Sequence, residues 1–458
     1  MLTTPSVLTL SVTPRHTTIG LNSHLTSDQV CATLKACNLD DGDTRAPVDV
    51  IVALDVSGSM EGQKLFLCQM TLQLLLRQLT PDDRFGLVSF SDDAIIEIPI
   101  RKVTTINRKL ADETIQQLGT RGMTNLSAAI GLAAQEMIAV ESPNEVRSIL
   151  LLTDGLTNQG ITSSLDIVEL TKNCLSLIDQ APITMFCFGY GSDHNEILLQ
   201  EMSAASPGGT YYYVEDVKQV ATAFGDALGG ILSVVAQSAI LNISVPDEAK
   251  ARGVDIIDVY YKNKVKTNDG WKVSLADFYA EESRDVLFSV KLADQSISEY
   301  PHVNVFVSYT NTIQKSLEIS KVCSCVIHRP QGQEMSTPNL DVEVQWLRVY
   351  ATDEMDKAST LAQEGDYMAA QVTIINCQST IMDHKSAALA SPLMTQILSD
   401  LKLVARGFEN QEMYQASGKM NVTRMVQSHG MQRCTEGSAT LENSYRSTKK
   451  KSMQEKFK

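Results

Sequence analysis

The chain has 458 residues, of which 43% are hydrophobic and 20% charged, and its formal net charge is -15 at pH 7. Single hydrophobic cores stop growing beyond about 250–300 residues, so we expect two or three folding units rather than one. The composition excludes disorder of the whole chain, and the negative charge argues against nucleic-acid binding, because phosphates are collected by a positive field.

The N-terminus and the cysteines point to a compartment without disulfides. Residues 1–5 show no basic region followed by an apolar run, so we expect no signal peptide, and no apolar stretch is long enough to cross a bilayer. The nine cysteines are odd in number and scattered, which does not indicate a disulfide framework. We therefore expect a cytoplasmic protein, with the nucleus as the alternative.

The N-terminal segment 1–45 is β-like, at Val7–Val12 and Val30–Leu34, but it is too short to fold alone. Short alternating strands return over residues 238–330, a pattern typical of a β-sandwich. We predict that segment 1–45 pairs with these later strands. The region between them would then be an insertion in a β domain.

Residues 46–237 alternate strand-like and helix-like patterns, which predicts a doubly wound α/β domain with a mostly parallel sheet. A hairpin around Ser91-Asp92-Asp93 should add an antiparallel edge strand. The other expected strands are 48–54, 148–152, 183–189 and 210–214, and the expected helices are 62–79, 108–118, 126–139, 165–178, 196–204 and 217–235.

The C-terminal part divides into a helical region and a tail. Residues 331–405 begin with linker chemistry and continue with apolar helical periodicity at 342–361, 367–377 and 385–405. Residues 406–458 lack sustained periodicity, so we predict a mostly disordered tail. The lysine run 449–451 fits a solvated terminus better than a nuclear-import signal.

Hard oxygen donors gather where two strands and a loop end. Asp55, Ser57 and Ser59 follow the first strand of the α/β region, and Asp154 follows the strand 148–152. Thr124 lies in the loop between two helices. Ligands of open α/β sheets bind beyond the carboxyl ends of the strands, and magnesium prefers oxygen ligands with one or two carboxylates. The pattern therefore predicts a metal site made by these five residues, although Asp55–Ser59 alone could equally cap the helix that follows.

Two other candidates are weaker. Cys323 and Cys325 with His328 nearby could bind zinc, but no second ligand cluster follows and alternation along a strand explains the spacing. His194 follows Asp193 in a loop, and we interpret it as a solvated histidine rather than a catalytic base.

The set D-V-S-G-S (55–59), Thr124 and T-D-G (153–155) resembles the metal-ion-dependent adhesion site of von Willebrand factor A domains, and the order of elements over 46–237 is similar. The runs F-G-Y-G-S-D-H (188–194), G-G-T-Y-Y-Y-V-E-D (208–216) and F-G-D-A-L-G-G-I-L-S-V-V (224–235) resemble a narrower group. That group contains intracellular A-domain proteins related to plant RING-type and U-box ubiquitin ligases. In it the A domain is followed by β-rich and helical regions.

The resemblance implies that Mg²⁺ or Mn²⁺ is held directly by Ser57, Ser59 and Thr124 and through waters by Asp55 and Asp154. It also implies an open coordination position that accepts an acidic side chain of a protein partner. The first functional hypothesis is thus a non-enzymatic, cation-dependent protein-binding module.

Two alternatives belong to other classes. The chain could be an adaptor or substrate-recognition subunit in ubiquitin ligation, but it has no RING or U-box and no C-x₂-C pair, so ligase activity does not follow from the resemblance. It could also be a Mg²⁺-dependent phosphohydrolase with Asp55 as nucleophile. That reaction would require a second aspartate two residues later, where Ser57 stands.

Overall fold

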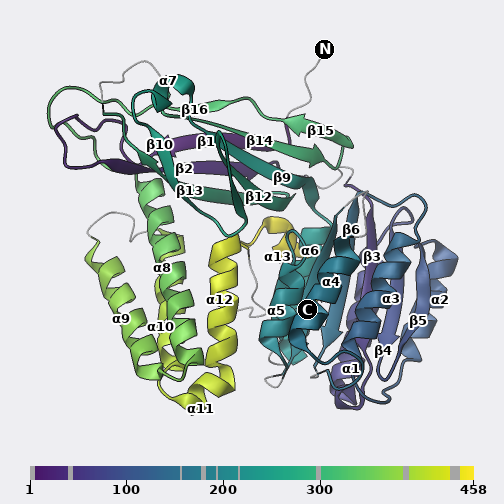
Figure 1. Cartoon of the computed structure of the whole chain (residues 1–458). Helices are drawn as coiled ribbons and strands as arrows, with labels where there is room; N and C mark the ends of the chain where they lie inside the picture. Colours follow the sequence, from purple (N-terminus) through teal and green to yellow (C-terminus); the bar gives the residue numbers. More distant parts are fainter. Residues whose placement is uncertain are drawn as a thin grey trace.

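The computed structural model describes residues 6–39, 45–154, 157–176, 182–191, 194–214, 217–294, 301–384, 391–433 and 444–457. Figure 1 shows three parts: an α/β domain, a β-sandwich and a helical bundle beneath the sandwich. No helix within the described ranges is long and apolar enough to cross a membrane.

The α/β domain contains a six-stranded sheet in the order β5-β4-β3-β6-β7-β8, in which only β5 is antiparallel. This arrangement confirms the predicted doubly wound fold with an antiparallel edge hairpin. The strands are β3 Val48–Asp55, β4 Arg84–Phe90, β5 Ala94–Lys102, β6 Val146–Thr153, β7 Ile183–Tyr190 and β8 Thr210–Val214.

Helices cover both faces of this sheet, which is why β3, β6 and β7 are buried along their whole length. One apolar core joins the sheet to α1, α2 and α6, and a second joins the opposite face to α3, α4 and α5. These helices are α1 Gln63–Gln78, α2 Thr105–Gln116, α3 Leu126–Ile138, α4 Ser164–Ser176, α5 Glu196–Ala204 and α6 Val217–Ile231, and a 3₁₀ turn, Gly58–Met60, precedes α1.

The β-sandwich contains strands from both sides of the α/β domain. β1 Leu8–Pro14 and β2 Ser27–Ala36 form one sheet with β13 Ser283–Lys291 and β10 Asp255–Tyr260, in the order β1-β2-β13-β10. Since β2 pairs directly with β13, the α/β domain is an insertion between two halves of the sandwich. The second sheet holds β11 Lys264–Thr267, β12 Gly270–Tyr279, β9 Val234–Ser244, β14 Val303–Asn311, β15 Ser316–Ile319 and β16 Cys323–Cys325, and a short helix, α7 Asp247–Lys250, follows β9.

The last helix of the α/β domain is shorter than predicted. It ends at Ile231, whereas we predicted a helix to Val235, and β9 begins at Val234. The prediction was wrong because the apolar run at the end of α6 fits the periodicity of a helix and that of a strand. The pairing of β9 with β12 and β14 makes its last residues a strand. The predicted boundary at residue 237 therefore falls inside a strand.

The helical region is a bundle with its own apolar core. Its helices are α8 Leu340–Gln363, α9 Tyr367–Asp383, α10 Pro392–Gly407, α11 Gln411–Met413 and α12 Lys419–Met431, with a π-helical turn at Tyr414–Gly418. The part of the predicted third helix at 385–390 lies outside the described residues. Val342 of α8 packs against Cys31 and Leu287, which joins the bundle to the sandwich.

The prediction of a mostly disordered tail over 406–458 is wrong for the residues that the structure describes. α12 belongs to the bundle, and α13 Thr448–Phe457 packs against α6 of the α/β domain (Figure 1). Residues 434–443, between these helices, lie outside the described residues.

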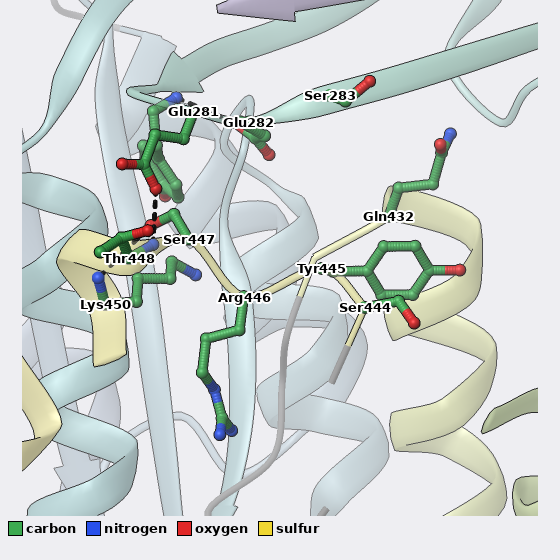
Figure 2. A pocket seen from close by; sticks show the side chains of 11 residues that line it. Glu281, Glu282, Ser283, Gln432, Ser444, Tyr445, Arg446, Ser447, Thr448 and Lys450 are labelled. Atoms are coloured by element: carbon green, nitrogen blue, oxygen red, sulfur yellow. Dashed lines mark hydrogen bonds between the residues drawn. The ribbon is translucent and has the colours of Figure 1, made fainter. Parts of the chain in front are cut away.

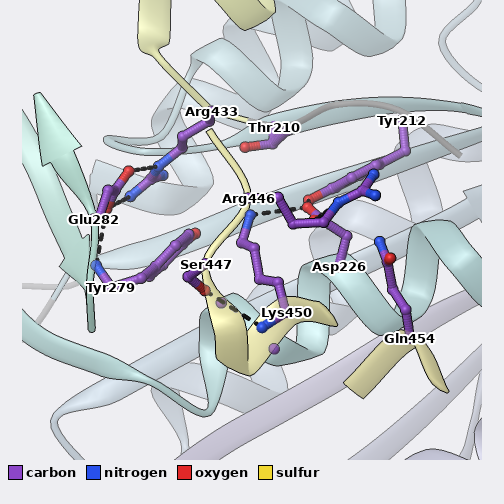
Figure 3. A network of polar contacts seen from close by, with 12 residues as sticks. Thr210, Tyr212, Asp226, Tyr279, Glu282, Arg433, Arg446, Ser447, Lys450 and Gln454 are labelled. Atoms are coloured by element: carbon purple, nitrogen blue, oxygen red, sulfur yellow. Dashed lines mark hydrogen bonds and ion pairs between the residues drawn. The ribbon is translucent and has the colours of Figure 1, made fainter. Parts of the chain in front are cut away.

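Charged side chains help to hold the tail at Arg433 and at α13, where apolar periodicity gave no signal, whereas α12 packs into the apolar core of the bundle. Arg433 and Lys450 are each only 2% exposed. Arg433 donates to Glu282 (2.8 Å) and to the carbonyls of Gly208 (2.9 Å) and Asp277 (2.6 Å), while Lys450 donates to Asp226 (2.9 Å), as Figure 3 shows in part. Figure 2 shows residues of the tail and of the sandwich around one pocket, with the Thr448 amide donating to Glu281.

The cysteine pair of the zinc alternative lies on β16. Cys325 is buried and Cys323 is partly exposed, as expected for alternate positions of a strand. The Cys323 thiol donates to the carbonyl of Leu10 (3.3 Å). Strand alternation therefore accounts for the spacing.

Candidate metal-binding site

The site begins at the carboxyl ends of two neighbouring strands. β3 and β6 run parallel, with Leu54 opposite Leu152, so Asp55 and Thr153 end their strands side by side. Asp154 follows immediately. The topology therefore brings together two carboxylates that are far apart in the sequence.

Asp55 is fully buried and fixed by two hydrogen bonds. One carboxylate oxygen accepts from the Ser57 amide (2.8 Å), and the other accepts from the Thr153 hydroxyl (2.6 Å). Burial raises the pKa of the Asp55 carboxyl, the hydrogen bonds from Thr153 and Ser57 oppose this rise, and the nearby Asp154 adds to it. Keeping the buried Asp55 carboxylate ionised therefore costs free energy in the protein without a bound cation.

A hydrogen-bonded chain continues from Ser57 to Asp154. The hydroxyls of Ser57 and Ser59 lie 3.1 Å apart, and the Ser59 hydroxyl donates to one oxygen of Asp154 (2.8 Å). Four of the five predicted residues are therefore linked to one another: Asp55, Ser57, Ser59 and Asp154. The other oxygen of Asp154 contacts the ammonium group of Lys64.

The fifth predicted residue, Thr124, belongs to a loop tied to the same edge. The Gly58 amide donates to the Gly122 carbonyl (3.2 Å), and the Arg121 amide donates to the Val56 carbonyl (2.7 Å). Thr124 itself is buried, and its amide donates to the Asn158 side chain (2.8 Å). The structure places its loop against the serine turn, but no hydrogen bond links its hydroxyl directly to the other four residues in the described part of the chain.

The Gly122 turn shows why this loop keeps its shape. Gly122 has φ +61°, and a Cβ there would lie 2.2 Å from a carboxylate oxygen of Asp92. Asp92 in turn accepts from the Met123 amide (3.0 Å). The hairpin turn between β4 and β5 thus supports the loop that carries Thr124.

Sequence reasoning did not identify Lys64, Thr153 and Asn158 as parts of the site. Thr153 was noticed only as a neighbour of Asp154, and its position at the end of a strand beside β3 was the available signal. Lys64 lies in the first turn of α1, close in sequence to Ser59. The residue pattern predicted a metal ion beside the two carboxylates but not the ammonium group of a lysine.

The donors present fit a hard divalent cation. Asp55, Asp154, Ser57 and Ser59 supply carboxylate and hydroxyl oxygens, which are the ligands that Mg²⁺ and Mn²⁺ prefer. Asp55 forms hydrogen bonds but no ion pair among the described residues. Lys64 therefore neutralises Asp154 but not Asp55, which leaves one buried carboxylate available to a divalent cation.

His194 is a buried structural residue, so the prediction of a solvated loop histidine is wrong. Its ring nitrogens lie 2.7 Å from the Gly191 carbonyl and 2.6 Å from the Tyr211 hydroxyl, and its exposed fraction is 3%. The ring fits because Gly189 has no side chain: a Cβ there would lie 2.3 Å from it. Its sequence position after a strand gave no sign of this packing.

The sequence pattern of the von Willebrand factor type A domain matches residues 49–226. The α/β domain of this chain is therefore a von Willebrand factor type A domain, hereafter the A domain. Domains of this class are protein-interaction modules and are generally non-catalytic.

Two solved structures share the fold over most of the chain. A von Willebrand factor type A protein from Catenulispora acidiphila aligns with 87% of this chain and 89% of its own, with a TM-score of 0.65 at 15% identity. The ArnB paralog VWA2 from Sulfolobus acidocaldarius aligns with 93% of this chain and 99% of its own, with a TM-score of 0.57 at 16% identity. These likenesses concern the fold alone.

Similar sequences occur in plants and cyanobacteria. The E3 ubiquitin-protein ligase WAV3 of Arabidopsis thaliana is 28% identical over 269 residues, which are 58% of this chain and 34% of the ligase. The uncharacterized protein sll0103 of Synechocystis is 25% identical over 328 residues, 68% of this chain and 72% of that protein. This chain thus spans about a third of the length of the plant ligase.

Proposed function

We propose that the A domain binds Mg²⁺ or Mn²⁺ through Asp55, Ser57, Ser59, Thr124 and Asp154, and through this cation an acidic side chain of a protein partner. The observation that carries the proposal is the hydrogen-bonded chain from Asp55 through the two serines to Asp154, at the carboxyl edge of a parallel sheet. This edge is where open α/β sheets bind ligands.

The protein residues would act as a fixed set of oxygen donors. The cation would supply an exchangeable coordination position for a carboxylate. Asp55 is held by Thr153 and by the Ser57 amide, so its orientation is set before any ligand arrives. Ser59 is exposed, so a partner can reach this edge of the site from solvent.

Titration calorimetry with MgCl₂ and MnCl₂ tests the cation. The wild type should release or absorb heat with one-site stoichiometry, and Asp55→Ala should abolish it. Asp49→Asn is the matched control, because Asp49 is also buried on β3 but lies at the opposite end of the strand, where it bonds Arg84 and Asn144. Equal heats for the wild type and Asp55→Ala would refute the metal site.

A second proposal concerns the ubiquitin pathway. The likeness to the Arabidopsis ligase extends over 269 residues, more than the A domain alone, and the present sequence contains no C-x₂-C pair. We propose an adaptor or substrate-recognition role in ubiquitin ligation as the alternative function. A pulldown with and without EDTA links the two proposals: a partner lost in EDTA binds through the cation, and a partner retained in EDTA does not.

A further inference from the structure

The second sheet of the sandwich has a free edge at β11. This strand stands at one end of the order β11-β12-β9-β14-β15 and pairs only with β12 among the described strands. The Asn263 carbonyl accepts from the Ser274 amide of β12 (2.9 Å), and the residues of an antiparallel strand direct their backbone groups alternately toward and away from the partner. The N–H and C=O groups of Lys264 and Lys266 therefore point away from β12. No backbone group in the described part of the chain pairs with them on that side.

This edge is basic in an acidic chain. Residues 261–275 contain four lysines and one aspartate, whereas the whole chain has a net charge of -15. Lys264 already pairs with an aspartate of β10, but Lys262, Lys266 and Lys272 are exposed and form no ion pair among the described residues. Lysines on an edge strand repel another basic strand, so the β11 edge of a second copy is excluded. The same charges attract an acidic strand.

A small, mostly apolar pocket adjoins the start of this edge. Its volume is about 170 Å³, and Lys262 and Asn263, which directly precede β11, form part of its wall. An apolar cavity of about 150 Å³ can hold a benzene-sized ring, whereas drug-sized ligands occupy about 300 Å³ or more. The pocket therefore fits one large apolar side chain. Its other walls come from α5, β12 and α12 (Figure 1) and include Gln200, Ala204, Leu275, Ala276, Val426 and Met431.

We propose that β11 binds an extended acidic segment of a partner protein, which adds to the sheet as a further strand and inserts one large apolar side chain into the pocket. Its backbone would pair with Lys264 and Lys266, and its carboxylates would lie against the exposed lysines. The free edge selects an extended peptide, the lysines select acidic side chains, and the pocket selects an apolar anchor. This interaction goes beyond the metal site, because it uses none of the metal-binding residues and needs no cation.

Fluorescence anisotropy with a labelled synthetic peptide tests this binding. The probe alternates glutamate and threonine and has phenylalanine at both ends, so that an anchor is available for either strand direction. It should bind the full chain saturably in EDTA, which removes divalent cations, and less tightly as salt is added. It should bind Asp55→Ala as tightly as the wild type, even where that variant has lost the cation. The same peptide with lysine in place of glutamate should not bind.

Charge reversal tests the basic edge. The double variant Lys262→Glu, Lys266→Glu should bind the peptide about tenfold more weakly or worse, because it replaces two attractions by two repulsions. The matched control is Lys315→Glu, Lys321→Glu. These exposed lysines flank β15 at the opposite end of the strand order in the same sheet, and the change in net charge is identical. The control should bind the peptide like the wild type.

Altered peptides test the edge and the pocket without changing the protein. Alanine in place of both phenylalanines should weaken binding about tenfold or more, because the anchor no longer buries its apolar surface. N-methylation of every second residue, made in both registers, should abolish binding in the register that removes the donors facing β11. The proposal is overturned if the peptide does not bind, if the charge-reversed edge binds it as well as the control does, or if the phenylalanine and alanine peptides bind equally. Tighter binding of a labelled oligothymidine than of the peptide would also overturn it, by assigning the lysines to a nucleic acid.

Discussion

In the protein alone, Lys64 supplies the positive charge beside Asp154 that the proposed cation would supply in the loaded protein. Its ammonium group contacts one oxygen of Asp154, while the other oxygen accepts from Ser59. Its side chain is still 35% exposed, so it can leave this contact for solvent without a large loss of burial. Lys64 therefore offers one positive charge where a divalent cation would offer two.

Lys64→Met tests this competition. Methionine keeps the length of the side chain and removes the charge, so both carboxylates become available to Mg²⁺. We expect the dissociation constant for Mg²⁺ in calorimetry to fall about tenfold or more, which corresponds to about 1.4 kcal/mol. Lys109→Met, an exposed lysine of α2 outside the site, should leave it unchanged. Weaker binding by Lys64→Met would show that Lys64 supports the site instead of competing.

Among single residues, the sequence indicated which oxygen-bearing side chains lie together better than it indicated how other side chains pack. The proximity of Asp55, Ser57, Ser59 and Asp154 could be predicted because the ends of parallel strands meet at one edge. The packing of His194 could not, because it depends on Tyr211 and on the absence of a side chain at Gly189. Neither partner is adjacent to it in the sequence.

Among the elements, α13 shows how a tail can be ordered without an apolar stripe. Two glycines of α6 allow its backbone to approach: a Cβ on Gly225 would lie 2.8 Å from the Cα of Gln454, and one on Gly229 would lie 2.8 Å from the Cα of Lys450. The two glycines are four residues apart, on the same face of the helix. They are therefore packing residues rather than helix breakers.

Gly225→Ala and Gly229→Ala should loosen α13. Overpacking typically costs about 1–3 kcal/mol, which exceeds the gain of about 0.5–1 kcal/mol from replacing glycine within a helix. Hydrogen exchange should show faster exchange in residues 448–457. Gly131→Ala on α3 is the control, since a Cβ there meets nothing within 4 Å, and it should stabilise the protein. Unchanged exchange of α13 in both variants would contradict this account of its docking.

The elements of the A domain were predictable because each buried strand is a continuous, mostly apolar run and each helix has one apolar face. α13 was not, because its sequence, TKKKSMQEKF, contains four lysines and few apolar residues. Its position depends on Lys450 reaching the buried Asp226, a contact between residues 224 positions apart. A contact between residues so far apart leaves no periodic pattern in the local sequence.

For the whole molecule, Glu282 is the point where three parts meet: the β-sandwich, the C-terminal tail and the A domain. It accepts from Arg284 of the sandwich (2.9 Å) and from Arg433 of the tail (2.8 Å), and Arg433 also binds the Gly208 carbonyl of the A domain. The insertion of the A domain could be predicted, since segment 1–45 is an incomplete sheet. This junction could not, because all its members are charged or backbone groups.

Glu282 should make the free energy of unfolding of the chain fall in acid. Burial alone would raise the pKa of this carboxyl, but the guanidinium groups of Arg284 and Arg433 outweigh burial and lower the pKa to about 2. The unfolded chain then binds more protons than the folded chain between about pH 4.5 and 2, so stability rises with pH in this window. The contribution is fully present above about pH 4.5, is on the order of 3 kcal/mol, and is lost as the pH falls towards 2.

Thermal unfolding of the wild type and Glu282→Gln from pH 7 to pH 2 measures this contribution. At pH 7 the variant should be less stable by roughly 3–5 kcal/mol, because it leaves two buried guanidinium groups without their carboxylate. The gap between the two proteins should narrow below about pH 4.5, where the wild-type carboxylate begins to lose its advantage. Glu113→Gln on the exposed surface of α2 should follow the wild type throughout. A constant gap from pH 7 to pH 2 would mean that the charge of Glu282 does not hold the three parts together.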